Sequence, residues 1–481
     1  MNNNDSKVLL EVKNLKKYFP LQKNMFGQPK FQLRAVDDVS FKLDAGKTIG
    51  VVGESGCGKT TLGRTILQLY DTTGGKTLYY GHSVDDYLPN YYKKEISKLS
   101  SYKNKFTKAL NLLSNLDLLG DEFKDIVNFN YDLVLGDYKN IITKLELLVN
   151  KSCEDENLHN QYKTAYNTLK RAIDILETAA CCSGGDIIAD IAGNSNLYND
   201  LCGLKEDGLD LARLTKSELR KLRTEIQLIF QDPYSSLPPR MTVGSILSEA
   251  VKVHKIVPKD QVRDHIRTIM RRCGLQPQYY DRYPHEFSGG QRQRICIARA
   301  LAVNPKLVIC DEPVSALDVS IQAQIINLLK ELQNELGLTY MFISHDLSVV
   351  KYITDSIIVM YLGNMMEVGD TDDIFQNPLH PYTQALFSAV PVPDPDAKMQ
   401  RIILKGDIPS PANPPKGCKF HTRCVHCKSV CKLKQPKFID MGNNHVVACH
   451  LYDKEIMADL AKYDEELAKL EKEEQNAQVN D

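Results

Sequence analysis

A glycine-rich segment follows one of the first apolar runs in the chain. Residues 53–61 are GESGCGKTT, which fits the pattern G-x-x-x-x-G-K-[ST] through Thr60. Such glycines let consecutive backbone N–H groups curl around nucleotide phosphates, and Lys59 adds a positive charge for the β- and γ-phosphates. The hydroxyl of Thr60 is a suitable ligand for Mg²⁺. We therefore expect a nucleotide to contact Gly53, Glu54, Ser55, Gly56, Cys57, Gly58, Lys59, Thr60 and Thr61.

Two carboxylates follow a second apolar run, far along the chain. Residues 307–313 are LVICDEP, which is typical of a buried strand that ends in Asp311 and Glu312. Asp311 would hold Mg²⁺ through water, and Glu312 would polarise the water that attacks the terminal phosphate. Acidic residues that only cap the next helix are the alternative interpretation of such a pair.

Three further elements favour phosphate chemistry over helix capping. Gln231 ends an apolar run and can reach the metal or the water, and His345 follows another such run and can contact the γ-phosphate. Glu312, His345 and Gln231 are therefore the expected catalytic residues, and Thr60, Gln231 and Asp311 the expected Mg²⁺ site. A second phosphate-binding segment is expected at the start of a helix, at Ser288, Gly289, Gly290 and Gln291.

Two phosphate-binding segments on a chain with only one lysine loop require an explanation. One copy of the domain would complete the site of another if the two formed a head-to-tail pair. ATP would then be sandwiched between the lysine loop of one copy and the serine–glycine segment of the other.

The elements that position these residues alternate between strands and helices. Short apolar runs of strand type occur on both sides of the glycine-rich loop, and a segment with helical apolar spacing follows the loop at residues 62–69. This order predicts an α/β nucleotide-binding fold. The expected strands cover residues 8–12, 40–43, Thr48–Val52, 226–230, 307–310, 340–343 and 356–360.

Composition narrows the class of protein. The 481 residues contain 60 basic and 61 acidic side chains, a net charge of −1, so the electrostatic case for a nucleic-acid partner is missing. No apolar run approaches the ~18 residues needed to cross a bilayer. The start, MNNNDSK, lacks the hydrophobic core of a secretory signal. We therefore expect a soluble intracellular protein whose cysteines are thiols or ligands rather than disulfides.

The motifs together resemble the ABC-type ATPase cassette: GESGCGKTT, Gln231, SGGQ, CDEP, SALD and His345. Three longer segments resemble the ATPase subunits of oligopeptide and dipeptide importers, in particular the "F" type: AVDDVSFKLDAGKTIGVVGESGCGKTT, IFQDPYSSL and NPLHPYTQALFSAVPVPDP. The resemblance covers about residues 8–82 and 208–452. It implies a P-loop cassette with a RecA-like core, an antiparallel β subdomain and a helical signature subdomain.

The resemblance also implies an activity and partners. The chain would hydrolyse ATP, with Mg²⁺, at the cytoplasmic face of the cell membrane as a peripheral subunit, and so power uptake of short peptides. Its partners would be a second ABC ATPase subunit, two permease subunits and, indirectly, an extracellular peptide-binding protein, with no nucleic acid. Phe19 would stack on adenine, with Tyr18 as the next choice. The alternative is a soluble ABC-type ATPase of DNA repair or chromosome maintenance.

Five parts are expected along the chain. Residues 1–82 and 208–371 form the cassette, and residues 83–207, rich in Tyr, Asn, Lys and Leu, form an inserted, mostly helical domain. A disordered loop is the alternative for this insertion. Residues 372–452 form the importer-type extension, whose proline-rich segment 377–415 is expected to be extended. Residues 453–481 form a charged helical tail, with one amphipathic helix over 454–475.

Five cysteines lie close together in the sequence of the extension, and one of them, Cys427, does not match the family pattern. The resemblance implies that the other four bind an iron–sulfur cluster of the [4Fe–4S] type. Four thiolates suit zinc equally well, so ligand type leaves the metal open, and a set of reduced thiols is the remaining alternative. The four expected ligands are Cys418, Cys424, Cys431 and Cys449.

Overall fold

The computed structural model describes residues 7–23, 29–82, 208–389 and 401–479, with the isolated residues 87, 89–91, 160, 163, 166 and 167. The chain divides into two compact units. The first comprises residues 1–79, 210–212 and 216–481, and the second comprises residues 80–209 and 213–215. Nearly all of the insertion expected at residues 83–207 lies outside the described residues.

The larger sheet of the first unit has eight strands in the order β11-β12-β10-β9-β3-β8-β7-β6. The five strands from β9 to β6 run parallel, and β10, β12 and β11 are antiparallel additions. Every residue of β3, β7 and β8 is buried, as expected for apolar strands covered on both faces. The bounds are β3 (Thr48–Val52), β6 (Ile226–Ile229), β7 (Leu307–Asp311), β8 (Thr339–Ile343), β9 (Ser356–Tyr361), β10 (Asn364–Asp370), β11 (Ile439–Asp440) and β12 (Val446–Val447).

The smaller sheet has the strand order β2-β1-β4-β5, and β1 pairs antiparallel with both β2 and β4. Its two long strands have 16 residues each, so they extend well beyond the short segments expected from the sequence. Several register shifts interrupt their pairing, and such bulges bend a long strand pair. The bounds are β1 (Val8–Lys23), β2 (Pro29–Asp44), β4 (Gly74–Tyr79) and β5 (Leu209–Asp210).

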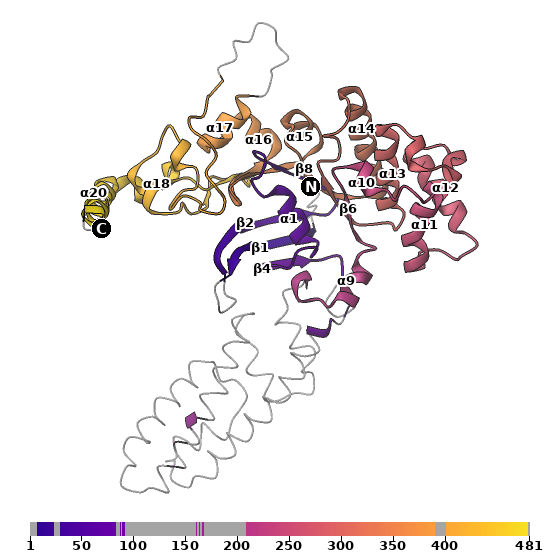
Figure 1. The fold of residues 1–481 in the computed structure, drawn as a ribbon, viewed down its shortest axis with the longest axis horizontal. Coiled ribbons are helices and arrows are strands. Elements are labelled where there is room, and N and C mark those ends of the chain that lie inside the picture. The colour runs from indigo at the N-terminus through magenta and orange to yellow at the C-terminus, as the bar shows by residue number, and fades with distance from the viewer. Residues whose placement is uncertain are drawn as a thin grey trace, which may run out of the picture. The chain divides into compact units, whose positions relative to one another are not determined.

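Helices cover the larger sheet and form a group beside β6. Figure 1 shows α11, α12 and α13 together at that end of the sheet, and α18 and α20 beyond its opposite end. One buried apolar cluster joins Ile246 of α11, Phe342 of β8 and Phe420 of the C-terminal extension. The described α-helices that precede α16 have the bounds α1 (Lys59–Ile66), α9 (Lys216–Leu222), α10 (Pro233–Ser236), α11 (Val243–His254), α12 (Val262–Arg272), α13 (Gly289–Leu301), α14 (Val319–Leu336) and α15 (Leu347–Ile353).

The C-terminal part differs from the expectation in two places. The proline-rich segment is not extended throughout, because His380 caps α17 (Pro381–Phe387) through its ring nitrogen and Pro381 suits the first helical turn. The tail is two helices, α19 (Lys454–Ala458) and α20 (Leu460–Val479), which are separated at Asp459. The remaining helices are α16 (Thr371–Gln376) and α18 (Ser429–Leu433). No helix in the described part of the chain is long and apolar enough to cross a membrane.

Candidate nucleotide site

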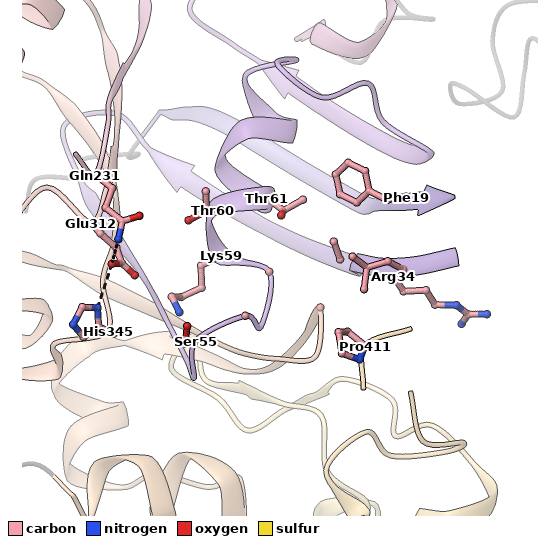
Figure 2. A pocket seen from close by; sticks show the side chains of 15 residues that line it. Phe19, Arg34, Ser55, Lys59, Thr60, Thr61, Gln231, Glu312, His345 and Pro411 are labelled. Atoms are coloured by element: carbon pink, nitrogen blue, oxygen red, sulfur yellow. Dashed lines mark hydrogen bonds and ion pairs between the residues drawn. The ribbon is translucent and has the colours of Figure 1, made fainter. Parts of the chain in front are cut away.

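A cavity of about 570 Å³ lies over the carboxyl ends of the parallel strands. Figure 2 shows Gln231, Glu312 and His345 together at one end and Phe19 and Pro411 at the other, with Lys59 and Thr60 between them. An elongated cavity of this kind can accept a nucleotide with its phosphates toward the carboxylates. The lining residues are Phe19, Leu33, Arg34, Ala35, Ser55, Gly56, Gly58, Lys59, Thr60, Thr61, Gln231, Glu312, His345, Gly363 and Pro411.

The glycine-rich loop joins β3 to α1 and places Lys59 in the middle of the cavity. Lys59 is 5% exposed, and its Nζ donates to the carbonyl oxygens of Gly53 (2.9 Å) and Glu54 (3.1 Å). Gly58 has a φ of +103°, and a Cβ there would lie 2.0 Å from the carbonyl oxygen of Ala35. The loop can therefore approach β2 only with glycine at this position. Gly53, Glu54 and Cys57 belong to the loop but are not among the lining residues.

Asp311 ends β7 and meets the start of α1. Its Oδ1 accepts a hydrogen bond from Thr60 Oγ1 at 2.7 Å, and its Oδ2 lies 3.7 Å from an Arg64 guanidinium nitrogen. The residue is 1% exposed and Oδ2 has no hydrogen-bond partner. Burial raises the pKa of this carboxyl above its usual value, and the Thr60 hydrogen bond and Arg64 oppose that shift. A buried, under-satisfied carboxylate beside a hydroxyl is suited to a divalent cation.

Glu312 is the meeting point of the residues expected to be catalytic. Gln231 Nε2 donates to Glu312 Oε2 at 2.8 Å, and His345 Nδ1 lies 3.3 Å from the same oxygen. Glu312 has a φ of +46°, which is rare for a non-glycine residue. Its N–H donates to the carbonyl of Ile343 at 3.0 Å and so ties the turn to β8. Backbone strain of this kind is found where a side chain must be held in position.

The opposite end of the cavity combines the apolar side chains of Phe19 and Pro411 with Arg34. Phe19 of β1 lines it and packs edge-on against Tyr70, with ring centroids 5.4 Å apart. Tyr18, the alternative for base stacking, donates its hydroxyl to Asp37 and is not among the lining residues. Pro411 also lines this end, although it comes from the C-terminal extension. The Phe19 ring offers an apolar face on which a base can stack.

The serine–glycine segment lies outside the cavity. None of Ser288, Gly289, Gly290 or Gln291 is among the lining residues. Ser288 Oγ accepts from the Gln291 N–H at 3.4 Å, and Gln291 Oε1 accepts from the Ser288 N–H at 3.2 Å, so the two residues form a capping box for α13. A Cβ on Gly290 would lie 2.5 Å from Ile321 Cγ2 of α14, so close helix packing requires this glycine.

The cysteines expected to bind a metal in the extension are neighbours, but they are not arranged as a metal site. Cys418, Cys431 and Cys449 are buried and Cys424 is half-buried, all as free thiols. Burial, with smaller contributions from neighbouring cysteines, raises the pKa of Cys418 and of Cys449 to about 12. Yet the described residues contain no group of three side chains placed to hold a metal ion. The metal centre expected from the sequence is therefore not supported by this geometry.

Sequence reasoning missed several contributors to the site. Arg34, Ala35 and Gly363 line the cavity from β2 and the β9–β10 turn, and Pro411 lines it from the extension. None of them belongs to a motif, because their placement depends on which segments pack together. Arg423 also reaches the glycine-rich loop, where its guanidinium lies 2.8 Å from Glu54 Oε2.

Comparison with known proteins decides the family. The model of the ABC transporter family matches residues 36–182 and 192–315, and that of the oligopeptide/dipeptide transporter C-terminal region matches residues 366–431. The chain belongs to the ABC transporter family. It is 39% identical to the oligopeptide transport ATP-binding protein AppF of Bacillus subtilis, over 93% of this chain and 98% of that protein.

Two further relatives of this ABC ATPase have similar coverage. The oligopeptide transport ATP-binding protein OppF of Salmonella typhimurium is 38% identical over 92% of this chain and 96% of its own length. The dipeptide transport ATP-binding protein DppF of Haemophilus influenzae is 36% identical over 92% and 97%. The resemblance to peptide-importer ATPases and the ABC cassette fold are thus confirmed. The alternative of a DNA-repair ATPase receives no support from these relatives.

Proposed function

We propose that this ABC ATPase hydrolyses ATP to power the import of oligopeptides or dipeptides through a membrane permease. The observation that carries the proposal is the near full-length match to oligopeptide and dipeptide transport ATP-binding proteins, which includes the C-terminal region. The cavity supports it, since the residues needed for phosphate binding and for water activation line the same space.

The residues predicted to bind and hydrolyse the nucleotide have proposed roles. Lys59 and the N–H groups of its loop would hold the β- and γ-phosphates. Thr60, Asp311 and Gln231 would hold Mg²⁺, which neutralises charge on the phosphates. Glu312 would take the proton of the attacking water, because its Oε2 is already positioned by Gln231 and His345. His345 would contact the γ-phosphate, and Phe19 would stack on the base.

The partner assembly is also a proposal. The serine–glycine segment starts α13 away from the cavity, so it is available to the cavity of a second cassette in a head-to-tail pair. We propose a second ABC ATPase subunit as that partner, with two permease subunits and, indirectly, an extracellular peptide-binding protein. The subunit would then sit at the cytoplasmic face of the membrane without spanning it.

For the cysteines we propose a metal centre that orders when its ion binds. The support is chemical: the pKa values of Cys418, Cys424 and Cys449 are raised by burial and, to a smaller extent, by another cysteine of the set, so the side chains are thiols when no cation is bound. A bound cation would stabilise the thiolates, which are the form that ligates metals. An iron–sulfur cluster, with zinc as the alternative, would supply that charge.

Peptide uptake tests the proposed function directly. The chain should restore uptake of a labelled oligopeptide or dipeptide in cells that lack the ATPase subunits of their own peptide importer, when its permease is supplied. The Glu312→Gln variant is the matched control, and uptake of a free amino acid is the substrate control. Restored uptake of a solute other than peptides would overturn the peptide assignment while keeping the ATPase.

A further inference from the structure

The C-terminal extension packs directly under the glycine-rich loop. Phe420 lies two residues after Cys418 and is 1% exposed. Its ring centroid lies 5.4 Å from that of Tyr361 at the end of β9 and 5.3 Å from that of Tyr382 in α17. Tyr361 and Tyr382 are fully buried and 4.9 Å apart. The turn that carries the cysteines therefore shares a rigid aromatic cluster with the last parallel strand.

Two members of this region hold the same residue of the glycine-rich loop. The Glu54 N–H donates to the Tyr382 hydroxyl at 2.9 Å. The Glu54 carboxylate accepts from Arg423 at 2.8 Å, in an ion pair whose side chains are 9% (Arg423) and 24% (Glu54) exposed. A charge-assisted hydrogen bond with little solvent access is among the stronger polar contacts in a protein. Glu54 is thus fixed through its backbone and through its side chain.

Glu54 in turn contacts the residue at the centre of the cavity. Its carbonyl oxygen accepts from Lys59 Nζ at 3.1 Å, and its neighbour Ser55 lines the cavity. A continuous series of polar contacts therefore runs from Arg423 through Glu54 to Lys59. Glu54 is not among the lining residues, so its carboxylate serves this tie rather than direct contact with phosphate.

We propose that Arg423 is a positioning residue for the nucleotide site: it holds the glycine-rich loop through Glu54 and so couples the C-terminal extension to ATP binding. The inference rests on the proposed function only in taking MgATP as the ligand. Because coupling is reciprocal, bound nucleotide should also order the extension around Arg423. The extension is then a part of the ATP site, and a change in its conformation alters nucleotide affinity.

A double-mutant cycle tests whether the Arg423–Glu54 interaction contributes to ATP binding. MgATP affinity is measured by fluorescence titration for Arg423→Gln, Glu54→Gln and the double variant, with Arg401→Gln, an exposed arginine of the same extension, as the control. Each single variant should weaken binding about tenfold, within the range of ordinary coupling between sites. The double variant should be no weaker than either single one, because one interaction is lost in all three. Arg423→Lys should recover part of the affinity.

Hydrogen–deuterium exchange over residues 417–433 supplies the reciprocal measurement. At saturating MgATP, exchange in this segment should slow in the parent and in Arg401→Gln but not in Glu54→Gln, which leaves the extension itself unaltered. A purely structural role for Arg423 would leave Glu54→Gln at parent affinity and would overturn the proposal. So would additive losses in the double variant. If these affinities and exchange rates are found but the parent drives no peptide uptake, the proposed function is wrong, whereas the positioning role of Arg423 is still supported.

Discussion

Replacing Asp311 by Asn should make the protein more stable while it loses its response to Mg²⁺. The carboxyl is 1% exposed, and its Oδ2 lacks a hydrogen-bond partner. The Oδ1 atom of an asparagine can still accept the hydrogen bond from Thr60 Oγ1, and the substitution removes the buried charge. A group selected to hold a metal is expected to cost stability in this way, because its charge is incompletely satisfied by the protein.

The magnitude follows from the contacts of Asp311. Leaving a buried polar group unsatisfied costs about 1–3 kcal/mol, and Arg64 at 3.7 Å offsets part of that cost. A net gain of about 1–2 kcal/mol corresponds to a rise in Tm of roughly 2–8 °C for a domain of ~200 residues. Burial raises the folded-state pKa of Asp311, so the ionised carboxyl destabilises the fold at pH values above that raised pKa. The gap between parent and variant should narrow as the pH falls through that raised pKa toward about 4.

Thermal unfolding monitored by fluorescence measures both effects, with Asp260→Asn as a control at an exposed carboxylate. Without nucleotide at pH 7, Asp311→Asn should melt above the parent. With MgATP at 100 times its dissociation constant, the parent should gain about 2.7 kcal/mol, and the variant should gain no more than it does with ATP and a chelator. A variant that melts below the parent, or that keeps the Mg²⁺-dependent gain, would refute the reasoning.

Three other changes have definite expected outcomes. Lys59→Ala should weaken ATP binding itself, because the ammonium at the centre of the cavity is lost; unchanged affinity in a titration would place the phosphates elsewhere. Deleting about residues 85–205 should leave a soluble chain that still binds ATP, since the unit that contains the insertion is compact on its own; loss of all folding would show that it belongs to the cassette core. Protein purified without oxygen should contain iron and acid-labile sulfide that Cys424→Ser removes; zinc without iron would change the metal, and no metal would leave reduced thiols.

The central part of the fold could be predicted because its local signals agree with its packing. The strand Thr48–Val52 has the predicted bounds, since a run of apolar residues that enters a glycine turn has few other stable conformations. Parallel strands end at one edge of a sheet, so residues that follow β3, β6, β7 and β8 meet over the same cavity. The roles of those residues stay predictions.

The remainder depends on contacts that no local pattern encodes. Arg423 and Glu54 are 369 positions apart, and Pro411 reaches the base end of the cavity from the extension. The long strands β1 and β2 contain prolines and polar residues, so their alternation is too weak to detect from the sequence. The proximity of the cysteines could be predicted from their positions in the sequence. The arrangement of their side chains in space, on which metal binding depends, could not.

ATP hydrolysis by Glu312→Gln, measured beside its affinity for MgATP, tests the central claim most directly. The amide can still occupy the position of the carboxylate between Gln231 and His345, but it cannot take a proton from water. We expect the rate of hydrolysis to fall at least about 100-fold while MgATP affinity stays within about twofold of the parent. Hydrolysis by the variant at the parent rate would contradict that claim.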